Sequence, residues 1–286
     1  MGPLAKRFLD RAIKRGTLIF ETVDGQRSVF GDGTGEPYVI KFHDDKVAVD
    51  IFKNPHLRFA ELYMDGRWSL VEGDLTKLFI FLFNEQRKNG LVAGWRGIFQ
   101  HVMRRVHQRN NARMARQNAS HHYDVGNDIY ALFLDEDWQY SCAYFADSDA
   151  SLEEAQLAKK RHIASKLMLE DDHRVLDIGC GWGGMGLYLA DNTGADVTGI
   201  TLSDEQASRA NARAAGRPDV RFKIEDYRAV NETFDRLVSV GMFEHVGVGY
   251  FDEYFAACRR LMKDDGVMLL HSIGRTGPPG YTAPFI

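Results

Sequence analysis

The chain has 286 residues, 44% of them hydrophobic and 27% charged, and its formal net charge is −4 at pH 7. This composition supports a packed core and argues against disorder. Its three cysteines are too few and too scattered for a disulfide framework or a Cys-x-x-Cys metal site, which fits a reducing cytoplasm.

No stretch of the sequence approaches the ~20 consecutive apolar residues that a membrane-spanning helix needs. The first 16 residues lack the apolar core and cleavage site of a signal peptide. We therefore expect a cytoplasmic protein whose contact with a membrane is peripheral.

Residues 17–68 alternate short apolar runs with turn signals. Tyr38–Phe42 and Lys46–Phe52, joined by His43–Asp45, are predicted to form hairpin strands, and helical periodicity follows near residues 75–84. We predict a small α+β domain over residues 1–115 and a second domain over residues 116–286.

The segment from Gln86 to Tyr123 contains no acidic residue. Its basic residues alternate with apolar ones, a pattern that suits an amphipathic segment on an anionic surface such as phospholipid head groups or nucleic acid. A solvated basic linker helix is the alternative, and this segment alone does not decide between them. The basic residues are Arg87, Lys88, Arg96, Arg104, Arg105, Arg109, Arg113 and Arg116.

From Ser151 onward, helix and strand patterns alternate. Ser151–Glu154 is a capping box that opens a helix running to about Leu169, and Ser203–Gln206 is a second capping box. This alternation predicts a doubly wound parallel sheet with its ligand at the carboxyl ends of the strands. The strand candidates are Val175–Ile178, Asp196–Thr201, Val220–Ile224, Arg236–Val240 and Val267–His271.

A glycine-rich loop follows the first of these strands, with glycines at positions 179, 181, 183 and 184. Such glycines let the backbone turn tightly and approach a ligand closely. Asp177, at the strand end, suits a cationic amino-acid moiety better than a pyrophosphate. A nicotinamide site would want an acidic residue at the end of the next strand, where Thr201 stands. A tight turn without a ligand is the remaining alternative.

Together these motifs resemble the cyclopropane-fatty-acyl-phospholipid and mycolic-acid cyclopropane synthases over residues 117–286, and the N-terminal part resembles the accessory domain of the phospholipid-acting members. The resemblance implies a Rossmann-like class I methyltransferase domain preceded by a small α+β, lipid-interacting domain. It rests on the glycine loop and on His122–Asp128, Tyr140–Phe145, Thr201–Gln206 and Gly241–Gly247.

The resemblance also implies two sets of site residues. S-adenosylmethionine would contact Tyr140, Ser141, Asp177, Gly179, Gly181, Thr201 and Gln206, with Asp226 and Tyr227 near the adenine. Bicarbonate would be held by Cys142, Glu244, His271 and Ile273. Taken singly, Cys142 could be a buried small hydrophobe, His271 a satisfied core histidine and Glu244 a helix-start carboxylate. His121 and His122 have no further ligand at helical spacing, so no metal is expected.

The implied reaction transfers a methylene unit from S-adenosylmethionine to the cis double bond of an unsaturated phospholipid acyl chain. It would proceed by methyl transfer, a carbocation and bicarbonate-assisted deprotonation. A methyl-branched product, or a cofactor- or lipid-binding fragment without activity, are the alternatives. The expected partner is unsaturated phospholipid at the inner membrane face, with no nucleic-acid partner; a homodimer is left open.

Methyltransferases of this fold normally carry an antiparallel strand pair after the fifth strand. Residues 272–286 are too rich in glycine and proline to supply it. We therefore expect a C-terminally incomplete methyltransferase domain, with the fifth strand as an exposed edge and weak or absent catalysis.

Overall fold

The computed structural model describes residues 3–89, 114 and 127–274. These residues belong to two compact units, and each is described by itself. The predicted domain boundary near residue 115, most of the basic segment and the pair His121–His122 lie outside the described residues, so those predictions stay predictions.

The first unit is built on a four-stranded sheet in the order β2-β1-β3-β4. β1 pairs antiparallel with β2 and parallel with β3, and β3 pairs antiparallel with β4. The strands are β1 (Thr17–Glu21), β2 (Arg27–Gly31), β3 (Pro37–Phe42) and β4 (Trp68–Glu72). The helices are α1 (Pro3–Ala12), α2 (Val47–Lys53), α3 (Pro55–Met64) and α4 (Leu75–Asn89).

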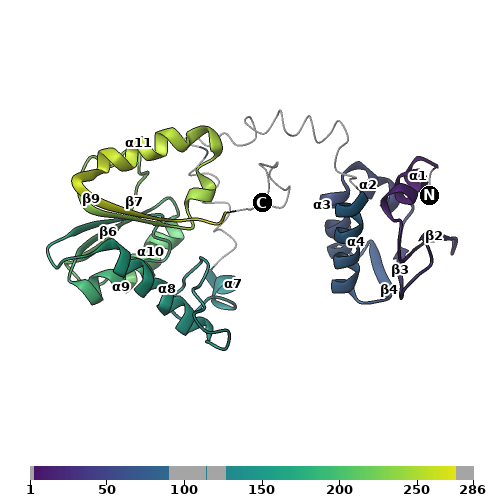
Figure 1. Ribbon diagram of the computed structural model, residues 1–286, viewed down its shortest axis with the longest axis horizontal. Helices are drawn as coiled ribbons and strands as arrows, with labels where there is room; N and C mark the ends of the chain where they lie inside the picture. Colours follow the sequence, from purple (N-terminus) through teal and green to yellow (C-terminus); the bar gives the residue numbers. More distant parts are fainter. Residues whose placement is uncertain (1–2, 90–113, 115–126, 275–286) are drawn as a thin grey trace. The chain divides into compact units, whose positions relative to one another are not determined.

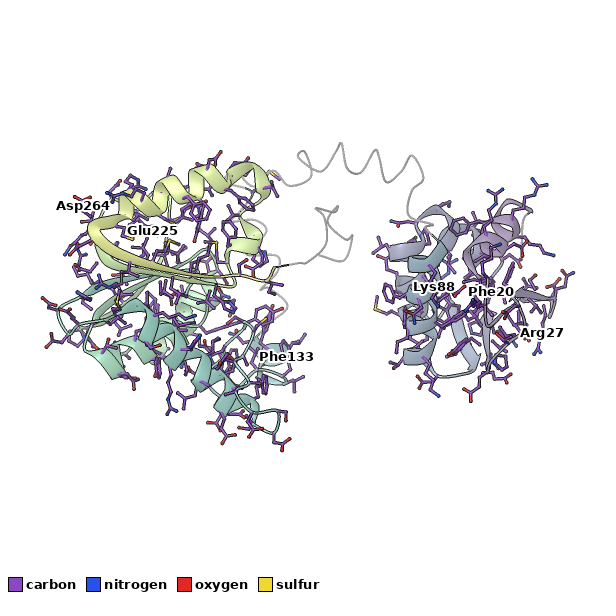
Figure 2. All side chains as sticks on the ribbon, viewed as in Figure 1. Phe20, Arg27, Lys88, Phe133, Glu225 and Asp264 are labelled. Carbon is purple, nitrogen blue, oxygen red and sulfur yellow. The ribbon has the colours of Figure 1, made fainter. Side chains whose placement is uncertain are left out.

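The core of this unit lies between the sheet and its helices. Phe20 belongs to it and is drawn inside the packed unit in Figure 2, and Trp68 is also buried. Glu85 of α4 is only 3% exposed, and its Oε2 accepts hydrogen bonds from the backbone N–H groups of Lys14 and Arg15 at 2.9 and 3.1 Å. The chain just after α1 is thereby fixed to α4.

The predicted strand Lys46–Phe52 is wrong, because these residues lie almost entirely in helix α2. Val47 is fully buried and Ile51 packs against the same core. Residues four apart share one face of a helix, so this short apolar run satisfies the helical period as well as the strand period. The helix predicted near residues 75–84 is confirmed as α4.

The second unit contains the predicted parallel sheet of five strands, in the order β7-β6-β5-β8-β9. The strands are β5 (Arg174–Ile178), β6 (Asp196–Thr201), β7 (Val220–Ile224), β8 (Phe234–Val240) and β9 (Met262–His271), which confirms all five strand candidates. The helices are α7 (Asn127–Ala131), α8 (Leu152–Leu167), α9 (Gly184–Thr193), α10 (Asp204–Arg213) and α11 (Phe251–Leu261), with the short 3₁₀ turns η1 (Phe243–His245) and η2 (Val248–Tyr250).

Helices cover both faces of this sheet. Figure 1 shows α11 along one face and α8 and α9 along the other. Two buried clusters fill the spaces between, one including Val197 and Leu189 and the other including Leu237 and Tyr254. The sheet is therefore doubly wound, as predicted.

The two predicted capping boxes have different outcomes. The first is complete, since Ser151 and Glu154 each bind the other's backbone N–H group. At the second, the Ser203 hydroxyl accepts from the N–H of Gln206, but the Gln206 side chain accepts a hydrogen bond from Thr201 instead of reaching back. The second box is therefore only half formed, because Gln206 has a partner on β6.

In the part of the chain that the structure describes, no helix has both the length and the apolar character needed to cross a membrane.

Candidate functional site

The site lies at the carboxyl edge of the five-stranded sheet, where β5 has β6 on one side and β8 on the other. The chain runs outward from β5 through β6 to β7, and later adds β8 and β9 on the opposite side. In doubly wound sheets, ligands usually bind beyond the carboxyl ends of the strands at the point where the strand order reverses in this way.

The glycine loop begins where β5 ends. The N–H groups of Gly179 and Cys180 both donate to the carbonyl of Ile200 on β6, at 2.9 and 3.0 Å, which anchors the loop. Gly181 has a φ of +56°, and a Cβ placed on it would meet no atom within 4 Å. The backbone at Gly181 therefore has open space beside it, which the prediction of a cofactor loop requires.

Gly179 has a different role in the same loop. Its φ is +82°, and a Cβ there would lie 2.7 Å from the Cβ and Cγ atoms of Met242. Gly179 is thus required by close packing with the segment after β8, whereas Gly181 leaves open space.

Asp177 is the buried carboxylate beneath this loop, with only 1% of its surface exposed. Burial raises the pKa of Asp177 to about 7, and the Lys159 charge acts in the opposite direction. Its Oδ2 has no hydrogen-bond partner among the described residues. Buried polar atoms are nearly always paired with protein, water or a ligand, so this carboxylate oxygen is available to a donor beyond the protein's own groups.

Tyr140 and Ser141 reach the same edge from a loop before α8. A Cβ on Gly241, which directly follows β8, would lie 3.4 Å from Ser141 Cβ and 3.8 Å from the Tyr140 carbonyl. Tyr140 remains 45% exposed, and its ring meets those of Tyr130 and Trp182 edge-on. The structure therefore brings both predicted residues to the carboxyl edge of β8.

The predicted pair Thr201 and Gln206 is buried at the end of β6. The Thr201 hydroxyl donates to Gln206 Oε1 at 2.7 Å, and the Ser203 N–H donates to the Thr201 hydroxyl at 3.3 Å. These side chains satisfy one another, and they fix the turn between β6 and α10.

Asp226 and Tyr227 follow β7 at the same edge. The Asp226 carboxylate accepts from the Arg228 side chain through both oxygens, at 2.8 and 2.6 Å. The Tyr227 ring packs edge-on against the buried ring of Tyr254, and burial raises the pKa of the Tyr227 hydroxyl to about 12. The Tyr227 ring is thus supported on one side by Tyr254, whereas the Asp226 carboxylate is already paired with Arg228.

Three of the four residues predicted to hold bicarbonate lie beside the ends of β8 and β9. Glu244 Oε1 accepts a hydrogen bond from the Ile273 N–H at 2.6 Å. His271 ends β9, where its carbonyl accepts from the Gly241 N–H at 3.0 Å. The buried Nδ1 of His271 has no partner among the described residues, so it is not a fully satisfied core histidine.

Cys142 is exposed, so the alternative of a buried small hydrophobe is wrong. It follows Ser141 at the carboxyl edge. None of the hydrogen bonds found within residues 127–274 joins it to Glu244, His271 or Ile273.

Several polar residues of this region were not singled out in the sequence. Lys159 Nζ donates to the Ser141 hydroxyl at 2.7 Å, and Gln156 Nε2 donates to the Ser141 carbonyl at 3.0 Å. Asn127 accepts from the Trp182 indole N–H at 3.0 Å, which connects α7 to the glycine loop. Gln156 and Lys159 share the inner face of α8 with apolar residues, and that spacing is the signal that could have identified them.

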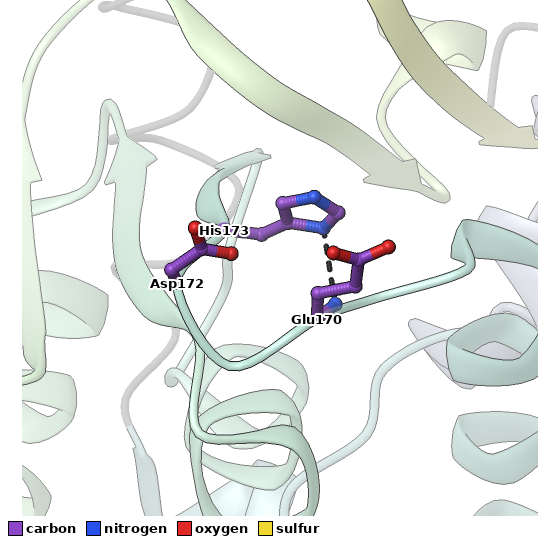
Figure 3. Close-up of side chains that lie close together, drawn as sticks. All are labelled: Glu170, Asp172 and His173. Atoms are coloured by element: carbon purple, nitrogen blue, oxygen red, sulfur yellow. Dashed lines mark hydrogen bonds between the residues drawn. The ribbon is translucent and has the colours of Figure 1, made fainter.

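Figure 3 shows a different cluster, formed by Glu170, Asp172 and His173, whose ligand-type atoms all lie within 4.8 Å of one another. It lies in the turn before β5, at the amino edge of the sheet. His173 Nδ1 accepts the Glu170 N–H at 3.0 Å, so this ring nitrogen closes the turn. The cluster is explained as a surface turn, remote from the carboxyl edge.

A protein-family model described as mycolic acid cyclopropane synthetase matches residues 110–281. The chain belongs to this family. The cyclopropane-fatty-acyl-phospholipid synthase of Escherichia coli (strain K12) is 42% identical over 228 residues, which cover 78% of this chain and 58% of that protein. The predicted resemblance is thereby confirmed.

Two solved structures of this family share the fold. The cyclopropane synthase MmaA2 from Mycobacterium tuberculosis has a TM-score of 0.54 at 38% identity, covering 55% of this chain and 56% of that one. The mycolic acid cyclopropane synthase CmaA1, complexed with SAH (S-adenosylhomocysteine) and CTAB, has a TM-score of 0.53 at 39% identity, covering 54% and 55%. These similarities confirm the Rossmann-like methyltransferase fold, and the chain spans little more than half the length of each relative.

Proposed function

We propose that this chain is an S-adenosylmethionine-dependent methyltransferase that converts the cis double bond of an unsaturated phospholipid acyl chain into a cyclopropane ring. The observation that carries the proposal is a pair of features at the carboxyl edge of the five-stranded sheet. The first is the open backbone at Gly181, in the loop that follows Asp177 and its unpaired oxygen. The second is the Glu244–Ile273 contact, two residues along the chain from His271 with its unpaired Nδ1.

The residues around the glycine loop fit S-adenosylmethionine. Asp177 offers a carboxylate oxygen to the ligand's cationic amino group, and the absence of a Cβ at Gly181 lets the ligand approach the backbone. The Tyr227 ring, backed by Tyr254, is suited to stack on the adenine. When bound, S-adenosylmethionine supplies a strongly electrophilic methyl group, which an isolated alkene needs because it is a weak nucleophile.

The residues at the ends of β8 and β9 suit a small anion. Bicarbonate would serve as the base that removes a proton after methyl transfer, and a base must lie within about 3 Å of its proton or act through one relay. His271 offers an unpaired ring nitrogen for holding it, and the Glu244 side chain fixes the backbone at Ile273. Both residues would position the anion, and neither would need to act as a nucleophile.

The share of this chain that each relative matches favours phospholipid over a mycolic acid as the substrate. The match with the bacterial phospholipid synthase covers 78% of this chain, against 54–55% for the mycolic acid synthases. Residues outside 110–281 therefore contribute to the match with the phospholipid enzyme. We also propose, on the same basis, that the enzyme acts peripherally at a membrane surface.

The test is to incubate the purified chain with vesicles of unsaturated anionic phospholipid and labelled S-adenosylmethionine, followed by mass spectrometry and proton NMR of the acyl chains. The proposal expects chains heavier by CH₂ that show cyclopropane protons and lose olefinic ones, with no product from saturated vesicles. Retained olefinic protons with an added methyl would favour a branching methyltransferase. Bound S-adenosylhomocysteine without any labelled lipid would contradict catalysis by this chain and favour the alternative of a cofactor-binding fragment without activity.

A further inference from the structure

Helix α8 directs a row of buried polar side chains toward the loop that contains Tyr140 and Ser141. Gln156, Lys159 and Lys160 are only 4%, 3% and 7% exposed. Lysine is almost never buried to this degree without a partner, because removing its charge from water is costly. The partners of these side chains therefore indicate why the helix carries them.

The two lysines have different partners. Lys160 forms an ion pair with Asp137, whose carboxylate also binds Arg213. The hydrogen-bond partner of Lys159 is instead the neutral hydroxyl of Ser141, at 2.7 Å. Among the described residues, Lys159 has no direct ion pair of the kind that Lys160 makes, and it brings a positive charge to the loop that contains Tyr140 and Ser141.

Gln156 binds the same loop as Lys159. Its Nε2 donates to the carbonyls of Gln139 and Ser141, at 3.2 and 3.0 Å. The N–H of Gln139 in turn donates to the buried carboxylate of Asp135 at 2.6 Å. Residues 139–141 are therefore held by α8 through both backbone and side chain.

The charges around Lys159 connect it to Asp177. Burial lowers the pKa of Lys159 to about 8, an effect that Asp135, Asp137 and Cys142 oppose and Lys160 reinforces. Lys159 in turn lowers the pKa of Asp177, against the larger effect of burial. The Cys180 thiol also interacts with Asp177, and burial raises its pKa, so it stays neutral.

The strands beside Asp177 add no charge to this group. Its register partners are Gly199 on β6 and Val238 on β8. Within the part of the chain that the structure describes, Lys159 of α8 is the cation that acts on the Asp177 carboxylate.

We propose that Lys159 is a positioning residue for the cofactor: it holds Ser141, and with it Tyr140, at the carboxyl edge, and its charge favours the ionised form of the Asp177 carboxylate, which accepts the ligand's amino group. This inference rests on the proposed function, since it needs S-adenosylmethionine at the carboxyl edge. Lys159 acts through Ser141 and Asp177 and does not itself touch the ligand.

The experiment measures binding of S-adenosylhomocysteine, which carries the same amino-acid end, by calorimetry on the full chain between pH 6 and pH 9. Lys159→Met is compared with Lys159→Arg and with Lys166→Met, a matched control because Lys166 is exposed on the same helix. We expect Lys159→Met to weaken binding about tenfold at pH 7, because the charge-assisted hydrogen bond from Lys159 to Ser141 is lost. The pH at which affinity falls on acidification should move upward, because Asp177 would protonate more readily.

The Lys159→Arg variant distinguishes positioning of the cofactor from simple packing of the Lys159 side chain, because arginine keeps the charge but changes the shape. The arginine variant should keep the wild-type pH midpoint, and Lys166→Met should keep both affinity and midpoint. A folded Lys159→Met variant with the wild-type midpoint would overturn the inference. If that variant does not fold, Lys159→Gln retains a donor for Ser141 without the charge, and its midpoint decides in the same way. No binding by the wild-type chain would overturn the proposed function, and this inference with it.

Discussion

The two edges of the five-stranded sheet satisfy their polar groups in opposite ways. At the amino edge, charged side chains on or beside the first residues of strands form ion pairs, such as Lys263 with Asp235 at 2.6 Å. Asp196 Oδ2 accepts a hydrogen bond from Arg221 at 3.0 Å, and Asp196 Oδ1, which is buried without a hydrogen bond, lies 2.7 Å from the same guanidinium group. At the carboxyl edge, the Asp177 and His271 side chains each have a buried atom without a hydrogen-bond partner among residues 127–274.

This difference indicates that polar groups at the amino edge serve stability, whereas those at the carboxyl edge serve ligand binding. Exposed ion pairs contribute little free energy each, so the amino edge can lose one of them without consequence. A buried polar atom without a partner costs about 1–3 kcal/mol, and a ligand that pairs with it recovers this cost. Mutations at the carboxyl edge should therefore change ligand binding or activity, whereas mutations at the amino edge should change stability only slightly.

The largest effect is expected at Glu244. Glu244→Gln keeps an oxygen for the Ile273 N–H but removes the charge beside the proposed bicarbonate. Product formation should fall about 100-fold or more, the range typical of disrupted proton transfer, whereas S-adenosylhomocysteine binding should be unchanged. The lipid assay with parallel calorimetry measures both, and full turnover by this variant would remove Glu244 from the mechanism.

Asp177→Asn should stabilise the ligand-free protein while weakening cofactor binding. The pKa of Asp177 is about 7 in the folded state against an ordinary 3.8, so between about pH 4 and 7 the folded protein retains a proton that the unfolded chain has lost. Stability of the wild type should therefore fall as pH rises through this range, by on the order of 2–4 kcal/mol, and the Asn variant should lack this loss.

Urea unfolding of both proteins at pH 4 and pH 8 tests the effect, and the free-energy difference between them should grow toward pH 8. An equal pH dependence for the two proteins would show that Asp177 is not the buried acid responsible.

A pair of glycine substitutions sharpens the contrast within the loop itself. Gly181→Ala adds a Cβ that meets no atom within 4 Å, so the free energy of unfolding should drop by only about 1 kcal/mol, while S-adenosylhomocysteine affinity should fall about tenfold. Gly179→Ala places its Cβ 2.7 Å from Met242 and should destabilise the protein by more. Thermal unfolding and calorimetry on both variants measure this, and tight binding by Gly181→Ala would argue against a ligand at that position.

The smallest effect is expected at the amino edge. Lys263→Ala removes an ion pair in which the lysine side chain is 46% exposed, and it should change the free energy of unfolding by less than about 1 kcal/mol. Its turnover should match that of the wild type. A large loss of activity would mean that the two edges are coupled and would break the comparison.

The sequence predicted the second unit well, because its signals are local. Each parallel strand is a short apolar run, and the glycine loop follows its strand directly, so Gly179, Gly181 and Asp177 could be placed without tertiary information. The prediction failed at Lys46–Phe52, because an apolar run of seven residues is compatible with both the strand period and the helical period. The structure forms a helix there, with Val47 buried in the core.

Interactions between distant residues were beyond the sequence. Lys159 meets Ser141 across 18 positions, and Ile273 meets Glu244 across 29. Spacing along the chain carries no information about such contacts, since they follow from how α8 and β9 pack. The resemblance to known enzymes named Glu244 and Ile273 but left Lys159 unmentioned.

The contact between Glu85 and the backbone of Lys14 and Arg15 also constrains the order of events during synthesis. It joins positions 70 and 71 residues apart, and the buried carboxylate finds its partners only after both segments exist. The chain after α1 therefore leaves the ribosome well before the helix that fixes it. The first unit should complete its folding in one late step, when α4 emerges, rather than progressively from its amino end.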